Sequence, residues 1–305
     1  MPLPIPAPHA SGQTTTTALP LYWAAYGVPG APRALVLHGG PGADHQYLLP
    51  QMLRLGEGPA ARELLFYDQR GGGRSKSDDR TPVTWRAHVD DLAAVARELI
   101  PASEPLTIVG YSWGGLLALL YTIEAARDPR LPRPQSLVLL DPAPVTRDYR
   151  REFEAEFARR QQGPAVQALR EELAASGLRE RDPDVYRQRA FELSVAGYFA
   201  DPAHARDLTP FRVVGRVQQS VWESLGDEHG DFDLRPALER AFAALPALRT
   251  LVVHGREDPI PLASSTDVAR AAGAELEVIE NAGHVPYVEG AEALFPAIER
   301  FLEAN

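Results

Sequence analysis

The sequence predicts an α/β fold, with a mostly parallel central sheet, helices on both faces and an inserted helical cap. First, short apolar runs alternate with longer helical stretches, as is typical of parallel strands that helices cover on both faces. Second, Gly-bearing turns follow several of the apolar runs. Third, the interval 144–246 contains charged helical segments and no convincing strand. This alternation favours right-handed crossovers around a single sheet.

The strands are predicted from runs of almost wholly apolar residues. An opening hairpin is expected at 14–21 and 21–26, where β-branched and aromatic residues gather after a flexible, Pro-rich lead-in over 1–12. The parallel strands are expected at Ala34–Leu37, Leu64–Tyr67, Leu106–Val109, Leu137–Leu140, Leu251–Val253 and Leu276–Ile279.

Helices are expected between these strands, at Trp85–Ile100, Trp113–Ala126, Ala263–Ala272 and Ala291–Glu303. The strandless interval predicts three parts: a first core segment (1–143), a helical lid (144–246) and a second core segment (247–305). A lid inserted after a strand overhangs the carboxyl ends of the strands, where open α/β sheets bind ligands.

Composition excludes several classes of protein. The 305 residues include no Cys, which excludes a disulfide scaffold, a thiolate nucleophile and an iron–sulfur cluster. The net charge of −10 argues against nucleic acid and anionic membranes as partners. No apolar run reaches the roughly 18 to 20 residues of a membrane span. The first residues lack a basic segment followed by an apolar one, so we expect a cytoplasmic protein.

A candidate nucleophile lies in the segment Gly110-Tyr111-Ser112-Trp113-Gly114, between a predicted strand and a predicted helix. The pattern G-x-S-x-G in this context is the nucleophile elbow, which exposes a serine hydroxyl on a strained turn. The flanking glycines allow close approach of neighbouring backbone, and the N-terminus of the helix favours developing negative charge. We therefore predict that Ser112 is a nucleophile.

A serine nucleophile needs a base and a group that orients the base. His284 follows the last predicted strand and is the candidate base. Asp258 follows the preceding strand and is the candidate acid. Asp141, which follows the strand Leu137–Leu140, remains an alternative because the acid can lie one strand earlier. Glu257, next to Asp258, is less favoured.

Acyl transfer also needs two amide donors for the oxyanion. One is expected from Trp113, the residue after the nucleophile. The other is expected from the loop His38-Gly39-Gly40-Pro41-Gly42, which follows the strand Ala34–Leu37. We assign it to the Gly40 amide.

The glycine loop, the elbow, the Gly255–Asp258 segment and the segment Asp68-Gln69-Arg70-Gly71-Gly72-Gly73-Arg74-Ser75 together resemble the prolyl aminopeptidases (proline iminopeptidases) of the α/β-hydrolase fold. The resemblance covers roughly residues 20–145 and 245–305. It implies that Asp68–Ser75 is a structural loop that supports the oxyanion side. It also implies a serine peptidase that needs no metal or organic cofactor.

Two positions depart from the family pattern. The family commonly has Cys where this chain has Gly72, and Gly where this chain has Tyr111. The first departure predicts an enzyme indifferent to thiol reagents. The second predicts a narrower pocket beside Ser112.

A prolyl aminopeptidase must bind the free amine of its substrate, and a buried ammonium requires a paired carboxylate. The resemblance implies glutamates in the lid, and we expect Glu192 and Glu223 to anchor the amine. An aromatic patch is expected to hold the proline ring, with Phe191, Tyr198, Phe199 and Trp222 as candidates.

The predicted function is a serine aminopeptidase that releases an N-terminal proline, or a similar small residue, from short peptides with a free N-terminus. Two alternatives remain open. One is an esterase, an amidase or an amino-acid-amide hydrolase on the same core. The other is a catalytically silent binding protein with a hydrolase fold.

Overall fold

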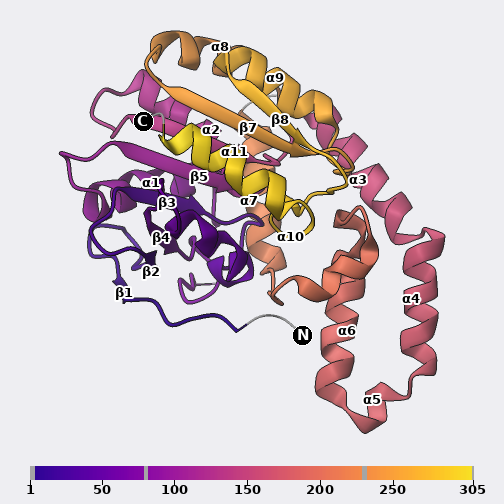
Figure 1. Cartoon of the computed structure of the whole chain (residues 1–305). Coiled ribbons are helices and arrows are strands. Elements are labelled where there is room, and N and C mark those ends of the chain that lie inside the picture. Colours follow the sequence, from indigo (N-terminus) through magenta and orange to yellow (C-terminus); the bar gives the residue numbers. More distant parts are fainter. Residues whose placement is uncertain (1–3, 79–81, 229–231, 304–305) are drawn as a thin grey trace.

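The computed structural model describes residues 4–78, 82–228 and 232–303. Within them, an eight-stranded sheet has the order β1-β2-β4-β3-β5-β6-β7-β8 (Figure 1). Only the β1–β2 and β2–β4 pairs are antiparallel, so the predicted mostly parallel sheet is confirmed. The strands are β1 (Ala10–Gln13), β2 (Tyr22–Gly27), β3 (Arg33–Leu37), β4 (Glu63–Tyr67), β5 (Leu106–Tyr111), β6 (Pro134–Leu140), β7 (Arg249–Gly255) and β8 (Glu275–Ile279).

The opening hairpin differs from the prediction. Gln13 of β1 pairs with Tyr22 of β2, so 14–21 is the connection rather than a strand, and 10–12, expected in the flexible lead-in, lies in β1. The backbone amides of Thr15 and Thr16 donate to the carboxylate of Glu98 at 2.8 and 2.9 Å. These amides therefore form no sheet hydrogen bonds. The β propensity of the threonines is overridden by their contact with Glu98, a residue distant in sequence.

Helices cover both faces of the sheet. On one face, α1 (Trp85–Leu99), α2 (Trp113–Arg127), α8 (Arg235–Ala244) and α9 (Leu262–Ala272) pack in a single core. On the other lie the short helices η1 (His45–Leu48), η2 (Gln51–Gly56) and α10 (Pro286–Glu289), together with α11 (Ala291–Glu303). Alternate residues of one strand enter opposite cores: Leu35 and Leu37 face the first, Ala34 and Val36 the second, as the two-residue period of a strand requires.

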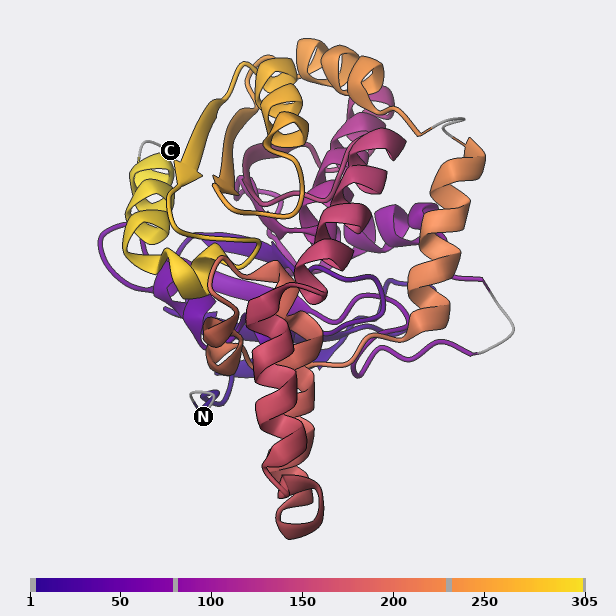
Figure 2. The same ribbon diagram turned by 90° about the vertical axis from the view of Figure 1, so that its right-hand side faces the viewer.

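The insertion follows β6 and is helical. It contains α3 (Arg147–Gln161), α4 (Pro164–Ala175), α5 (Leu178–Arg181), α6 (Pro183–Val195), η3 (Ala196–Tyr198), η4 (Pro202–Asp207) and α7 (Gly215–Glu228). Figure 2 shows α4, α5 and α6 projecting away from the sheet as a helical hairpin.

The predicted lid ends at residue 246 and therefore includes α8 (Arg235–Ala244). This helix packs against α2 and α9 and buries Leu238 and Phe242 in the core on the sheet. We therefore group α8 with the core, and the division of the chain into domains stays a proposal. In the part of the chain that the structure describes, no helix combines the length and the apolar character needed to cross a bilayer.

Candidate active site

Ser112 lies on the sharp turn between β5 and α2. Its backbone has φ 54° and ψ −118°, a strained conformation for a residue with a side chain. The two flanking glycines make this turn possible. A Cβ atom on Gly110 would lie 2.6 Å from the carbonyl oxygen of Gly114, and one on Gly114 would lie 2.2 Å from that of Leu37. The predicted strand–turn–helix context of the elbow is therefore present.

His284 and Asp258 meet Ser112 at the carboxyl ends of the parallel strands. His284 Nε2 lies 2.9 Å from Ser112 Oγ, and His284 Nδ1 lies 2.8 Å from Asp258 Oδ2. The second contact makes Nδ1 the protonated nitrogen, which leaves Nε2 free to accept the serine proton. Asp258 is held in turn, because its Oδ1 accepts the amide of Ile260 at 2.7 Å.

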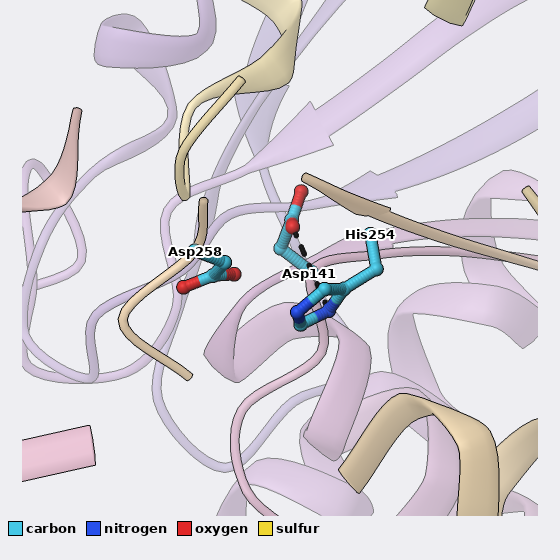
Figure 3. A group of neighbouring side chains, drawn as sticks. All are labelled: Asp141, His254 and Asp258. Atoms are coloured by element: carbon cyan, nitrogen blue, oxygen red, sulfur yellow. Dashed lines mark ion pairs between the residues drawn. The ribbon is translucent and has the colours of Figure 1, made fainter. Parts of the chain in front are cut away.

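Asp141, the alternative acid, lies beside Asp258, whereas His284 pairs with Asp258 and not with Asp141. Asp141 Oδ1 accepts the amide of Gly255 at 2.7 Å. Figure 3 shows Asp141, Asp258 and His254 as one group, and each offers a ligand atom within 4.8 Å of the others. The nitrogens of His254 already pair with Ser265 Oγ at 2.9 Å and with the carbonyl of Ile260 at 3.1 Å. Both nitrogens of His254, Asp141 Oδ1 and both carboxylate oxygens of Asp258 thus hold contacts within the protein. Because most of the ligand atoms are engaged in this way, we assign no metal to the group.

The two buried carboxyl groups have opposite pKa shifts. Burial alone would raise the pKa of Asp258, but the charge and hydrogen bond of His284 lower it below its usual range. Burial, and next the charge of Asp258, raises the pKa of Asp141 well above its usual range. These opposite shifts favour the ionised form of Asp258, beside His284, and the protonated form of Asp141.

The two predicted oxyanion donors face the same cavity. Gly40 adopts φ +62°, a conformation that glycine reaches at no steric cost, and Trp113 is the first residue of α2. Both residues line the cavity beside Ser112. Among the described residues, neither backbone amide donates to a protein acceptor, so both are available for a substrate oxygen.

The loop Asp68–Ser75 is expected to support the residues that bind the oxyanion. Its Gln69 contacts both of their segments. Its side-chain amide donates to the carbonyl of His38 at 2.7 Å, and its Oε1 accepts the indole N–H of Trp113 at 2.8 Å. The backbone amide of Gln69 also donates to His38 Nε2 at 3.0 Å. One buried side chain thus ties together the two segments that present the oxyanion donors.

The departures at Gly72 and Tyr111 have direct structural consequences. A Cβ atom on Gly72 would lie 1.9 Å from the carbonyl oxygen of Ala43, so this loop has no room for a side chain. Tyr111 lines the cavity, and its hydroxyl donates to the carbonyl of His284 at 2.9 Å. The tyrosine therefore forms part of the cavity wall beside Ser112 and also holds the loop of the base; that it narrows the pocket stays a prediction.

The cavity encloses about 140 Å³, a size that accommodates a small ring. Its walls are mostly aromatic and aliphatic, and no Asp or Glu is among the described residues that line it. Apart from His284, the ionisable groups there are tyrosines and one cation, Arg150. From the core come Gly40, Pro41, Tyr47, Tyr111, Ser112, Trp113, Ala143, Ile260, His284, Val285 and Tyr287; Pro144, Arg150, Phe153, Val195, Tyr198, Leu208, Phe211, Val213, Gln218 and Trp222 come from the predicted lid.

Tyr198 and Trp222 occupy the positions expected of them. Both line the cavity, and the ring of Tyr198 lies 5.2 Å from that of His284, centre to centre. Phe199, by contrast, is 2% exposed and packs in the core. Phe191 packs against the ring of Phe211 at 5.5 Å and is not a lining residue. The expected aromatic patch is therefore only partly present.

The expectation that Glu192 and Glu223 reach the cavity is wrong in this structure. Glu192 forms an ion pair with Arg189, one turn earlier on α6, at 3.0 Å. Glu223 is exposed and accepts the side-chain amide of Gln219 at 2.8 Å. Since successive residues of a helix point about 100° apart, α7 cannot direct both Trp222 and Glu223 into the cavity.

Sequence reasoning missed several lining residues, among them Tyr47, Arg150 and Phe211. The hydroxyl of Tyr47 accepts the amide of Gly39 at 2.6 Å and so fixes the glycine loop. Arg150 is one of many arginines in a charged helical segment, and nothing in its local pattern separates it from its neighbours. These residues converge only through the path of the insertion over the sheet.

An elbow serine, a paired histidine and two free amides on this fold define the class of the α/β hydrolases. The profile of the alpha/beta hydrolase family matches residues 34–297, and the chain belongs to this family.

Over 106 residues the chain is 35% identical to the proline iminopeptidase of Saccharolobus solfataricus, covering 34% of this chain and 33% of that protein. That alignment spans about a third of the relative's length. A longer one, with the proline iminopeptidase of Lactobacillus crispatus, is 25% identical over 290 residues and covers 89% of this chain and 90% of the relative.

Solved structures share the fold over nearly the full chain. A proline iminopeptidase of Mycobacterium smegmatis has a TM-score of 0.66 at 21% identity and covers 97% of this chain and 98% of that one. A 2-hydroxy-6-oxo-6-phenylhexa-2,4-dienoate hydrolase of Rhodococcus sp. strain RHA1 has a TM-score of 0.62 at 21% identity and covers 96% and 98%. At these identities the likeness shows the fold alone, and the two differ in the substrates their names give.

Proposed function

We propose that this protein is a serine hydrolase that cleaves esters or amides through an acyl-enzyme on Ser112. The observation that carries the proposal is the unbroken chain from Ser112 Oγ through His284 to Asp258, at 2.9 and 2.8 Å, on the wall of a cavity that also presents two free amides. This arrangement provides a nucleophile, a base, an orienting acid and an oxyanion site.

The reaction follows from these positions. Ser112 Oγ attacks the carbonyl carbon of the substrate while its proton passes to Nε2 of His284, and Asp258 stabilises the resulting imidazolium. The amides of Gly40 and Trp113 bind the oxyanion. His284 then gives the proton to the leaving alcohol or amine as its bond to the acyl carbon breaks. Water, activated by the same histidine, hydrolyses the acyl ester and regenerates the serine.

The first test is turnover of p-nitrophenyl butyrate together with labelling by a fluorophosphonate. We expect both in the native protein and neither in Ser112→Ala. Labelling elsewhere, or turnover that survives in Ser112→Ala, would contradict the assignment. A folded native protein without either reaction would favour the catalytically silent binding protein.

For the acyl group, the lining of the cavity favours a small group without positive charge. Burying an ammonium ion without a paired carboxylate is strongly unfavourable, and the described cavity wall offers Arg150 rather than Asp or Glu. We therefore propose esters or amides of small neutral or anionic acyl groups as the substrates.

A prolyl aminopeptidase is the second candidate, and the sequence similarity favours it. The relatives named proline iminopeptidase and the motifs of the glycine loop and the Asp68–Ser75 loop support a substrate with an N-terminal proline. The cavity is also large enough for a pyrrolidine ring.

Proline p-nitroanilide, its N-acetylated form and p-nitrophenyl butyrate distinguish the two candidates. We expect the ester to be cleaved fastest and acetylation of the amine not to reduce turnover. Exclusive turnover of the free-amine substrate would establish the aminopeptidase instead. In that case, Glu192→Gln and Glu223→Gln would show whether either carboxylate moves into the cavity when substrate binds.

A further inference from the structure

Arg150 is a charged side chain in the wall of an otherwise mostly apolar cavity. It lies in the first turns of α3, directly after the insertion leaves the sheet at β6. The start of this helix is fixed, since Thr146 Oγ1 accepts the amide of Tyr149 at 3.1 Å. Arg150 therefore occupies a defined position at the ligand-binding edge of the sheet.

The guanidinium group is held between the cavity and the surface. Its central carbon lies 3.7 Å from the centre of the Trp222 ring, a close cation–π contact. Its Nε lies 2.9 Å from Glu154 Oε1, one turn further along α3. The side chain of Arg150 is 28% exposed and that of Glu154 is 53% exposed, so the ion pair lies toward the solvent.

These contacts leave much of the guanidinium unused. A guanidinium has five N–H donors, and Glu154 engages the Nε donor. Within the described ranges, Glu154 is the acidic partner of the guanidinium, and no Asp or Glu lines the cavity. Burial lowers the pKa of Arg150, but an arginine remains a cation at neutral pH. The wall of the cavity thus contains a cation whose acidic partner, Glu154, lies outside the cavity.

We propose that Arg150 binds a carboxylate at the far end of the substrate's acyl group, so that the preferred substrates are monoesters or monoamides of short dicarboxylic acids. This inference rests on the proposed function. A carboxylate suits the planar fork of the guanidinium. We place it on the acyl group because this part of the substrate remains in the small cavity, bonded to Ser112, after the leaving group departs.

The reaction itself is unchanged. The ester bond of the monoester breaks, the alcohol leaves with the proton from His284, and water releases the dicarboxylic acid. The distal carboxylate stays bound to Arg150 throughout. It therefore contributes to binding and positioning, and Arg150 determines specificity.

The test compares mono-p-nitrophenyl esters of succinate, glutarate and adipate with neutral p-nitrophenyl esters of matched chain length. The measured quantity is the ratio of kcat/KM for each carboxylated ester to that for its neutral partner. We expect at least one ratio of about tenfold or more in the native protein, since a hydrogen bond to a charged partner contributes about this much. In Arg150→Gln, this ratio falls to about one.

Two variants complete the design. Arg150→Lys keeps the charge but loses the planar fork, and we expect an intermediate ratio. Glu152→Gln changes an exposed residue of the same helix and should keep the native ratio. Circular dichroism and fluorophosphonate labelling of Ser112 confirm that each variant is folded.

The outcomes separate this inference from the proposed function. Ester turnover that depends on Ser112, with ratios at or below one or with a ratio unaffected by Arg150→Gln, overturns the role of Arg150 alone. Absence of any turnover, or turnover independent of Ser112, overturns the proposed function itself.

Discussion

Asp141 and Asp258 place two carboxyl groups side by side, although 117 positions along the chain separate them. Oxygen atoms of the two side chains lie within 4.8 Å of each other, and both side chains are 0% exposed. Two carboxylates this close in a buried region cannot both ionise readily. His284 stabilises the charge on Asp258, which favours the protonated form of Asp141.

This relationship predicts a pH-dependent effect of Asp141→Asn on stability. The folded-state pKa of Asp141 is raised, so its protonated form is favoured in the folded state. The resulting stability is fully present below the unfolded pKa and is lost as pH rises toward the folded pKa, at up to about 1.4 kcal/mol per pH unit. An asparagine avoids this loss. We expect Asp141→Asn to match the native free energy of unfolding near pH 4 and to exceed it near pH 7.5.

Urea unfolding of both proteins at the two pH values measures this effect. Asp148→Asn, at an exposed position of α3, serves as the control for replacing an aspartate by an asparagine. An Asp141→Asn protein that is less stable at pH 7.5, or a difference that does not change with pH, would show that Asp141 is ionised in the folded protein.

The same pair predicts unequal effects on catalysis. Asp258 accepts the Nδ1–H of His284, so Asp258→Asn favours the wrong tautomer of the base and should lower kcat by about 10⁴-fold. Among the described residues, no hydrogen bond or ion pair joins Asp141 to His284, and we expect Asp141→Asn to lower kcat by less than about tenfold. Steady-state hydrolysis of p-nitrophenyl butyrate provides the comparison. A larger loss in Asp141→Asn than in Asp258→Asn would reverse the assignment of the acid.

Gly72 predicts a steric effect in the loop that supports the site. A Cβ atom there would lie 1.9 Å from a backbone oxygen of Ala43, and backbone cannot move aside as a flexible side chain can. We expect Gly72→Ala to reduce the free energy of unfolding by about 3 kcal/mol or more. Gly215→Ala is the matched control, because a Cβ atom there meets nothing within 4 Å. Equal stability of the two variants in urea would contradict the tight packing of this loop.

The hydrogen bond between Trp113 and Gln69 predicts coupling between the elbow and its supporting loop. Gln69→Leu leaves the buried indole N–H without its acceptor, at a cost of about 1 to 3 kcal/mol. In Trp113→Phe that donor is gone. We therefore expect the double variant to be less destabilised than the sum of the single variants. Urea unfolding of the four proteins measures the coupling, and strict additivity would show that the contact contributes nothing.

Local sequence was sufficient for the parts of the site that depend on neighbouring residues. The glycines around Ser112 are required by distances within one turn, so the elbow could be recognised without the fold. His284 and Asp258 follow predicted parallel strands, whose carboxyl ends must meet at one edge of the sheet. The order of nucleophile, acid and base along the chain therefore predicted correctly that Ser112, Asp258 and His284 lie together.

Contacts between distant segments decided the rest. Thr15 and Thr16 leave the sheet because Glu98, on a helix far along the chain, takes their amides. Glu223 faces solvent because the rotation of α7 about its axis directs Trp222 inward. The choice of Asp258 over Asp141 depends on which carboxyl group the histidine ring reaches.

The sequence by itself determined the α/β architecture and the segments that hold the nucleophile, the base and the oxyanion amides. These features follow from strand and helix periodicity and from glycines needed within a single turn. Only the tertiary structure decided which lid side chains face the substrate. The rotation of a helix on a sheet is set by the packing of many side chains at once, and that packing places Arg150, rather than either glutamate, at the cavity.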